Sequence, residues 1–145
     1  MASKAVETRM RRDDAANILC EHGITPTAQR VDIAAVLLAR PQHVCAEDLQ
    51  KLLARNGMPV SKATVYNTLG LFARTGLVRE LFVESDKVLY DSNTTNHDHI
   101  YDVDTGALTD IEPGAIEPSA LRALPAGTEV ESVEVVIRVR RTRRS

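Results

Sequence analysis

The sequence predicts an α/β (α+β) protein with an N-terminal winged helix-turn-helix domain over residues 1–88 and a small C-terminal α/β domain over residues 89–145. Three observations lead to this prediction. Apolar side chains recur at helical spacing in four segments before residue 76. Residues 77–90 then follow the pattern of a two-stranded hairpin, which is the wing of such a fold. Beyond residue 96 the pattern changes to short strands separated by turn residues.

The first two helices are identified by their spacing and their ends. Apolar residues between Ala15 and Cys20 repeat at helical spacing, and Gly23 is the residue that ends this segment. Thr25 is expected to cap a second helix, with Pro26 at its first position. That helix should stop before Pro41, because the residue that precedes a proline disfavours helical dihedral angles.

Two more helices and the hairpin complete the first domain. The third helix is expected to begin near Cys45, with acidic residues in its first turn facing the positive end of the helix dipole. Ser61 is expected to cap a fourth helix over residues 62–75, whose apolar face points inward. The hairpin should then pair residues 77–83 with residues 87–90.

The second domain is predicted from weaker patterns. Residues 97–101 and 107–111 are expected to form short strands joined by a turn at residues 104–106. A weak helical pattern covers residues 117–124, and a valine-rich strand is expected over residues 130–139.

Composition and cysteine content exclude several classes of protein. The chain has 145 residues, of which 43% are hydrophobic and only 3% aromatic. Its longest apolar run covers residues 33–39, which is too short to span a membrane, so a cytoplasmic protein without membrane contact is expected. Cys20 and Cys45 are far apart, which argues against a disulfide framework and against a cysteine-rich zinc site.

Charge is distributed unevenly along the chain. Residues 1–83 hold 11 basic and 8 acidic side chains, whereas residues 84–137 hold 2 basic and 12 acidic ones. The last eight residues add five arginines, which we interpret as a solvated tail. The pattern favours a front half that meets a polyanion and a back half that binds cations.

The predicted fourth helix has the features of a helix that enters the major groove of DNA. Small residues near its start allow close approach, and donors on its outer face are able to reach phosphates and base edges. Arg30, at the start of the second helix, is placed to bind a neighbouring phosphate. The alternative is an ordinary solvated face of an amphipathic helix. The residues expected to contact DNA are Arg30, Lys62, Thr64, Tyr66 and Asn67.

A second set of residues has the composition of a metal site. His97 and His99 are two residues apart, so they share one face of a strand, and Asp110 lies across the following turn. Asp91 ends the wing, and His43 precedes the third helix. Imidazole and carboxylate ligands without thiolate suit Fe(II), Mn(II) or Zn(II). The alternative is a histidine pair that merely decorates a polar strand.

Four motifs in register resemble the ferric uptake regulator family. They are residues 25–30 (Thr-Pro-Thr-Ala-Gln-Arg), 41–43 (Pro-Gln-His), 63–69 (Ala-Thr-Val-Tyr-Asn-Thr-Leu) and 97–99 (His-Asp-His). The resemblance covers about residues 15–140. It implies a homodimeric repressor that binds a double-stranded DNA operator through its first domain and dimerises through its second. It also implies one regulatory divalent metal per subunit, Fe²⁺ or Mn²⁺ (with Zn²⁺ in purified protein), held by His43, Asp91, His97, His99 and Asp110.

Details of the resemblance favour particular branches of that family. The peroxide-sensing branch is similar to this chain in having aspartate at position 110, where the iron-sensing branch usually has glutamate. In that branch metal-bound histidines are oxidised. By analogy, the oxidised residues in this chain are His43 and His97. The segment 133–141 resembles the haem-linked iron response regulators, which remain an alternative although no Cys-Pro motif occurs here. The family's paired cysteines are absent, so no structural four-cysteine zinc is expected.

Two alternative hypotheses from other functional classes are also compatible with the sequence. Three histidines and two aspartates are sufficient for a mononuclear metal enzyme, although no separate base or nucleophile is evident and no catalytic residue is assigned. A winged-helix interaction module without metal is the other reading. In the preferred hypothesis, a metal-dependent DNA-binding regulator, the metal connects His43 of the first domain to ligands at or beyond the hinge. Metal binding and DNA binding are then thermodynamically linked.

Overall fold

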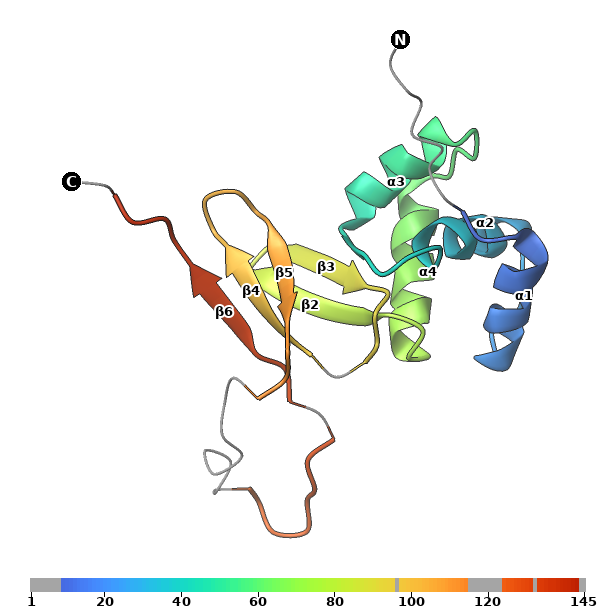
Figure 1. Ribbon diagram of the computed structural model, residues 1–145. Helices are drawn as coiled ribbons and strands as arrows, with labels where there is room; N and C mark the ends of the chain where they lie inside the picture. Colours follow the sequence, from blue (N-terminus) through green and yellow to red (C-terminus); the bar gives the residue numbers. More distant parts are fainter. Residues whose placement is uncertain (1–8, 96, 115–123, 132, 144–145) are drawn as a thin grey trace. The chain divides into compact units, whose positions relative to one another are not determined.

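The protein divides into two compact units. The structure is a computed structural model that describes residues 9–95, 97–114, 124–131 and 133–143 (Figure 1). The first unit ends at Thr94 and the second begins at Thr95. The change of unit therefore follows the last strand of the wing, β3 (Lys87–Asp91), and leaves that strand intact.

The described part of the first unit contains four helices. Ser61 caps the last of them as predicted, because its hydroxyl accepts the N–H of Thr64 at 3.2 Å. In this part of the chain no helix is both long and apolar enough to cross a membrane. The helices are α1 (Arg12–Glu21), α2 (Ala28–Leu37), α3 (Ala46–Arg55) and α4 (Lys62–Arg74).

The start of α2 differs from the sequence prediction. Thr27, and not Thr25, caps this helix, since the Thr27 hydroxyl accepts the N–H of Arg30 at 3.4 Å. The backbone at Thr27 is still extended, so Pro26 lies before the cap and not at the first helical position. The prediction was two residues too early because either threonine satisfies the capping pattern in the sequence.

A three-stranded antiparallel sheet completes the first unit. Its order is β1 (His43–Val44), β3, β2 (Arg79–Glu84). The hairpin of β2 and β3 was predicted, but β1 was not. A strand of two residues has no detectable periodicity, so only its partner β3 defines it.

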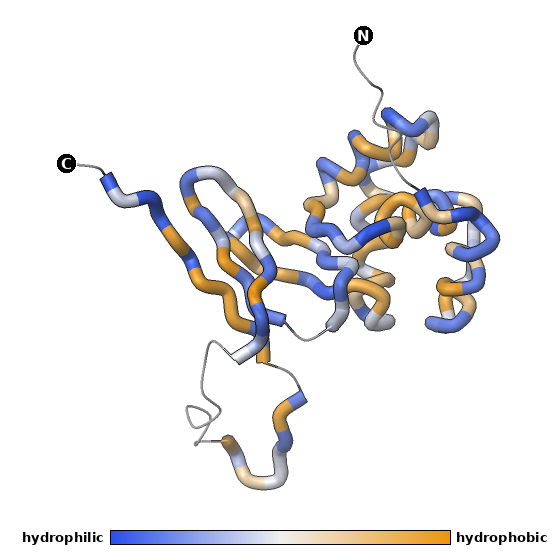
Figure 2. The backbone as a smooth tube through the Cα atoms, in the orientation of Figure 1, coloured by the Kyte–Doolittle hydropathy of each residue, from blue (hydrophilic) through white to orange (hydrophobic). Residues whose placement is uncertain are grey.

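The core of the first unit comes from all four helices and the wing. Val65, Leu69 and Phe72 are fully buried on the inner face of α4, which confirms the predicted apolar face. Each large apolar side chain removed from water contributes about 1.5–3 kcal/mol. Figure 2 shows apolar residues recurring along these helices, and Figure 1 shows α2 and α3 beside α4. Packing of the inner face leaves the opposite face of α4 to carry exposed polar residues.

The second unit contains a separate sheet of mixed direction. Its order is β5 (Leu108–Ile111), β4 (Asp98–Asp102), β6 (Val136–Val139), with β4 antiparallel to β5 and parallel to β6. The strand predicted over residues 130–139 is shorter in the structure, because pairing with β4 begins only at Val136. The helix predicted over residues 117–124 lies outside the described residues except for Leu124, which is not helical.

Candidate metal centre and nucleic-acid interface

His43 and Asp91 form the first group of candidate ligands, on neighbouring strands of the wing. They are opposite one another in the β1–β3 register, and His43 Nε2 lies 3.3 Å from Asp91 Oδ2. Asp91 is wholly buried, and its other oxygen accepts the N–H of Asn93 at 2.8 Å. Arg79 stands opposite Asp91 on β2. Directly opposite residues share a face, so the buried carboxylate lies between an imidazole and a cationic side chain in the strand register.

Gln42 and Ser92 hold this pair in place. The Gln42 side chain donates to the carbonyls of Val36 and Leu37, at 3.0 and 2.8 Å, where α2 ends. The Gln42 N–H donates to Ser92 Oγ at 3.0 Å, and the Ser92 N–H donates to the Gln42 carbonyl at 3.1 Å. The residues next to His43 and Asp91 are therefore tied to one another and to α2. Sequence reasoning missed both residues, because neither has a side chain that suggests a site.

Replacing Gln42 with leucine is expected to lower the free energy of unfolding by about 1–3 kcal/mol. The variant keeps the size of the side chain but removes two hydrogen bonds to partly buried carbonyls, each worth about 0.5–1.5 kcal/mol. Urea denaturation followed by circular dichroism measures the change. The exposed Gln29, in the first turn of α2, gives the matched control Gln29→Leu. Equal stabilities of the two variants would contradict the anchoring role.

His97, His99 and Asp110 form the second group, which lies within the second unit. His99 and Asp110 are opposite one another in the β4–β5 register, as the turn at residues 104–106 predicted. Asp110 Oδ1 lies 3.5 Å from His97 Nε2 and 3.4 Å from His99 Nε2, and the two imidazole rings are 4.4 Å apart. Both histidines are buried, whereas Asp110 is partly exposed. Two imidazoles thus converge on one carboxylate oxygen near the surface.

The chemistry of this group fits a cation. His97 Nδ1 lies 2.5 Å from the Thr95 carbonyl, which only accepts, so Nδ1 carries the hydrogen. In a neutral ring Nε2 then presents a lone pair toward Asp110 Oδ1, which is also an acceptor. Positive charge is needed at that contact. The ligand atoms of His97, His99 and Asp110 lie within 4.8 Å of one another, as ligands of a single ion do.

The cysteines belong to neither ligand group. Cys20 is exposed, and Cys45 is half-buried at the N-cap of α3. Burial, together with the nearby Asp48 carboxylate, raises the pKa of the Cys45 thiol. A raised pKa disfavours the thiolate that binds metal, so the donor chemistry of the two groups is imidazole and carboxylate.

Three of the five predicted DNA contacts gather where the start of α2 meets the outer face of α4. Arg30, Thr64 and Asn67 line a shallow pocket of about 250 Å³ there. The Arg30 guanidinium donates to the Thr25 carbonyl at 3.0 Å, which holds it at the edge of the pocket. Thr27, the cap of α2, lines the same pocket. The arrangement gives a concave polar surface with one fixed cation, suited to a phosphate.

The other two predicted contacts, Lys62 and Tyr66, meet a carboxylate that sequence reasoning did not connect with them. Tyr66 donates its hydroxyl to Glu47 Oε1 at 3.3 Å, and Lys62 Nζ lies 3.8 Å from the same oxygen. Lys62 Nζ also lies 5.8 Å from the centre of the Tyr66 ring. Glu47 was interpreted only as an acidic residue at a helix start, since its 19-residue separation from Tyr66 gives no periodic signal.

The fold and the donor chemistry define the chain as a winged-helix protein that carries histidine–carboxylate groups suited to a divalent metal. The model of the "Ferric uptake regulator family" matches residues 21–138. The chain belongs to the ferric uptake regulator family, whose members are metal-sensing transcription regulators.

Relatives and solved structures agree with this assignment. The peroxide operon regulator of Bacillus subtilis (strain 168) is 34% identical over 118 residues, which is 81% of each chain. The ferric uptake regulation protein of Synechococcus elongatus is 40% identical over 86 residues, 57% of this chain and 58% of that one.

Two solved regulators confirm the predicted fold class. The ferric uptake regulator of Vibrio cholerae has a TM-score of 0.72 at 26% identity and covers 86% of this chain and 98% of its own. The Pseudomonas aeruginosa ferric uptake regulator, solved with manganese, has a TM-score of 0.69 at 27% identity and covers 89% and 98%.

Proposed function

We propose that the chain is a metal-dependent DNA-binding repressor with one regulatory divalent metal per subunit. The ligands in this proposal are His43, Asp91, His97, His99 and Asp110. The observation that carries it is the convergence of two buried imidazoles on one oxygen of Asp110, with the tautomer of His97 set by Thr95. Histidine nitrogens and a carboxylate oxygen that face one another in this way are typical of a metal site. In such sites a neighbouring carbonyl, here that of Thr95, often orients the ligating imidazole.

The chain length between the two ligand groups permits a single site. Asp91 is the last residue of β3 and His97 follows six positions later, a distance of at most roughly 20 Å when fully extended. A bound metal would supply positive charge that the lone pairs of both carboxylates and the three imidazoles favour. Residues 84–137 carry a large excess of acidic side chains, which further favours a cation in this region.

In this proposal the ligands set how readily the first unit binds DNA. His43 and Asp91 belong to the unit with the exposed face of α4, whereas the other three ligands belong to the second unit. A shared metal therefore biases the hinge between residues 91 and 97. A coupling of about 1–3 kcal/mol corresponds to a roughly 5- to 150-fold change in DNA affinity. The DNA contacts in this proposal are Arg30, Lys62, Thr64, Tyr66 and Asn67.

A second copy of the chain is the proposed partner for the second unit. Within the described residues β6 is an edge strand, and its Ile137 and Val139 are exposed, as are Val130 and Val133 before it. Apolar side chains on a sheet edge are stabilised by burial against another chain. A twofold dimer also presents two copies of α4 to a palindromic operator. Operator binding places the protein with the DNA, in the cytoplasm.

The metal proposed is Fe²⁺ or Mn²⁺, with peroxide or iron supply as the signal. The peroxide operon regulator of Bacillus subtilis and the ferric uptake regulator solved with manganese are among the relatives by name. Zn²⁺ has the same donor preferences and is expected in purified protein. No structural four-cysteine zinc is proposed, since the chain holds only two cysteines.

A DNA-binding titration tests this function. A duplex selected from a random library is titrated with the protein in Fe(II), Mn(II), Zn(II) or no metal, before and after peroxide. We expect metal to raise the affinity, and peroxide to abolish the gain only in the iron-loaded protein. Mass spectrometry should then find an added oxygen on the peptide that contains His43 or His97. An affinity that no metal changes would contradict the proposal.

A further inference from the structure

The Glu47 carboxylate contacts both Lys62 and Tyr66, two residues on the outer face of α4. We propose that Glu47 is a specificity-determining residue for DNA. It weakens the binding of duplexes that offer only their phosphates, and it permits the binding of duplexes whose base edges replace its contacts with Lys62 and Tyr66. The inference rests on the DNA-binding function proposed above, and it assigns to Glu47 a role separate from metal binding.

Glu47 lies where favourable electrostatic partners surround its carboxylate. It lies in the first turn of α3, where the positive end of the helix dipole favours an anion. Its side chain is 57% exposed, so water stabilises the charge, and Lys62 Nζ lies 3.8 Å away. Desolvation, together with the Glu47 charge, raises the pKa of Tyr66, which therefore remains a neutral hydroxyl donor at neutral pH.

The contacts of Glu47 engage the groups that would otherwise bind phosphate. The ammonium of Lys62 is partly neutralised, and the hydroxyl of Tyr66 is directed at a carboxylate oxygen. A duplex that offers only phosphates must release these contacts and also bring its own charge near Glu47. A duplex with a suitable base edge returns both contacts: a base acceptor takes the tyrosine hydroxyl, and the amino group of cytosine donates to the carboxylate.

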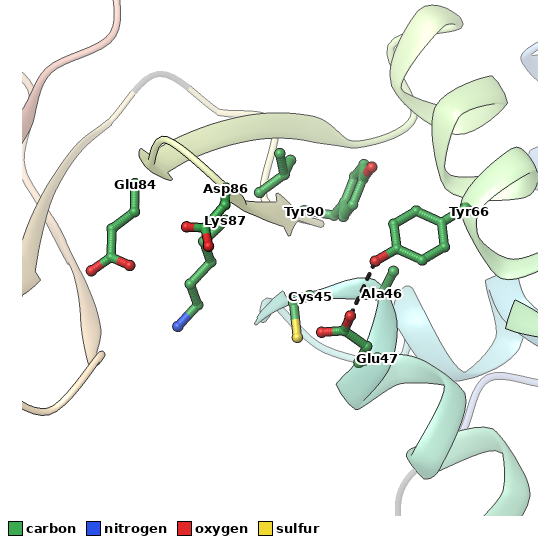
Figure 3. Close-up of a pocket in the computed structure, with 9 residues that line it drawn as sticks. Cys45, Ala46, Glu47, Tyr66, Glu84, Asp86, Lys87 and Tyr90 are labelled. Carbon is green, nitrogen blue, oxygen red and sulfur yellow. Dashed lines mark hydrogen bonds between the residues drawn. The ribbon is translucent and has the colours of Figure 1, made fainter.

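The surface beside Glu47 and Tyr66 is acidic as well. Glu47 and Tyr66 line a pocket of about 400 Å³, together with Glu84, Asp86 and Lys87 of the wing (Figure 3). Three carboxylates and one lysine make this pocket acidic on balance. It is therefore unfavourable for a phosphate, in contrast to the pocket beside Arg30. The pocket beside Arg30 therefore favours a phosphate, whereas the pocket beside Glu47 disfavours one.

The test compares wild-type protein with Glu47→Gln, which keeps the shape and removes the charge. Metal-loaded protein is titrated with its selected duplex and with a scrambled duplex over a range of salt concentrations. We expect the affinity for the scrambled duplex to rise roughly 5-fold, the effect of one charge contact in water. The plot of log affinity against log salt concentration should steepen by the slope of about one phosphate contact, because Lys62 is released from Glu47. The ratio of the affinity for the selected duplex to that for the scrambled duplex should fall.

Asp48→Asn is the matched control, because it removes one charge from the same helical turn. Its ratio of selected to scrambled affinity is expected to stay at the wild-type value. In Glu47→Gln/Lys62→Ala, the added salt dependence should disappear again. A wild-type protein that discriminates between duplexes while Glu47→Gln keeps the same ratio and salt dependence would overturn the Glu47 proposal alone. A wild-type protein that prefers no duplex in any metal would overturn the proposed function as well.

Discussion

Replacing His99 with alanine is expected to lower the affinity for Mn²⁺ by at least about 100-fold. His99 lies on the central strand of its sheet, is 2% exposed, and points Nε2 at Asp110 from 3.4 Å. Loss of an outer-shell partner alone typically costs about 10- to 100-fold in metal affinity, and removal of a ligand costs more. Isothermal titration calorimetry with Mn²⁺ measures the change directly.

The controls separate ligand loss from damage to the fold. His22 is exposed, and its ring donates to the Ile18 carbonyl of its own helix, so His22→Ala should bind Mn²⁺ like the wild type. Asp110 is partly exposed, and Asp110→Asn removes a charged ligand without a buried cavity. We expect Asp110→Asn to lose affinity as well, with an unchanged circular dichroism spectrum. Wild-type affinity in both His99→Ala and Asp110→Asn would exclude this group as the metal site.

Periodicity and capping predicted the helices well because their signals are local. Ser61 and its hydroxyl contact with Thr64, and the buried face of α4, follow from residues within one or two turns. Where two local solutions are equally good, the sequence does not distinguish them. Thr25 and Thr27 are both competent caps, and only the folded backbone selects Thr27.

Elements defined by a distant partner were beyond sequence reasoning. Strand β1 exists because His43 and Val44 pair with β3, almost fifty residues later. The length of β6 is likewise set by β4. The contact of Glu47 with Tyr66 depends on how α3 packs on α4, and the role of Gln42 depends on where α2 ends.

The candidate ligands were easier to predict than the hydrogen bonds that hold them in place. The turn at residues 104–106 predicts by strand geometry alone that His99 and Asp110 lie opposite one another, and His97 directly precedes β4. The residue types also limit the chemistry to imidazole and carboxylate donors. The supporting contacts of Thr95, Asn93 and Ser92 use backbone groups, which leave no signature in the sequence.

His43→Ala is expected to abolish the dependence of DNA affinity on metal while leaving the protein folded. The His43 side chain is 17% exposed on a two-residue edge strand, so the space that its loss opens lies next to solvent and beside the polar Asp91, where water is able to fill it. His97, His99 and Asp110 are intact in this variant and should still bind Mn²⁺, with weaker affinity. Without His43 the metal no longer connects fully to the first unit, and the roughly 5- to 150-fold gain in DNA affinity should disappear.

Thermodynamic linkage makes the His43→Ala prediction testable from either ligand. If metal raises the affinity for DNA by a given factor, DNA must raise the affinity for metal by the same factor. Mn²⁺ titrations with and without the selected duplex should therefore differ by that factor in the wild type and coincide in His43→Ala. His22→Ala serves again as the control and should behave like the wild type. A His43→Ala protein whose metal affinity still rises with DNA would mean that the coupling reaches the DNA-binding unit by another route.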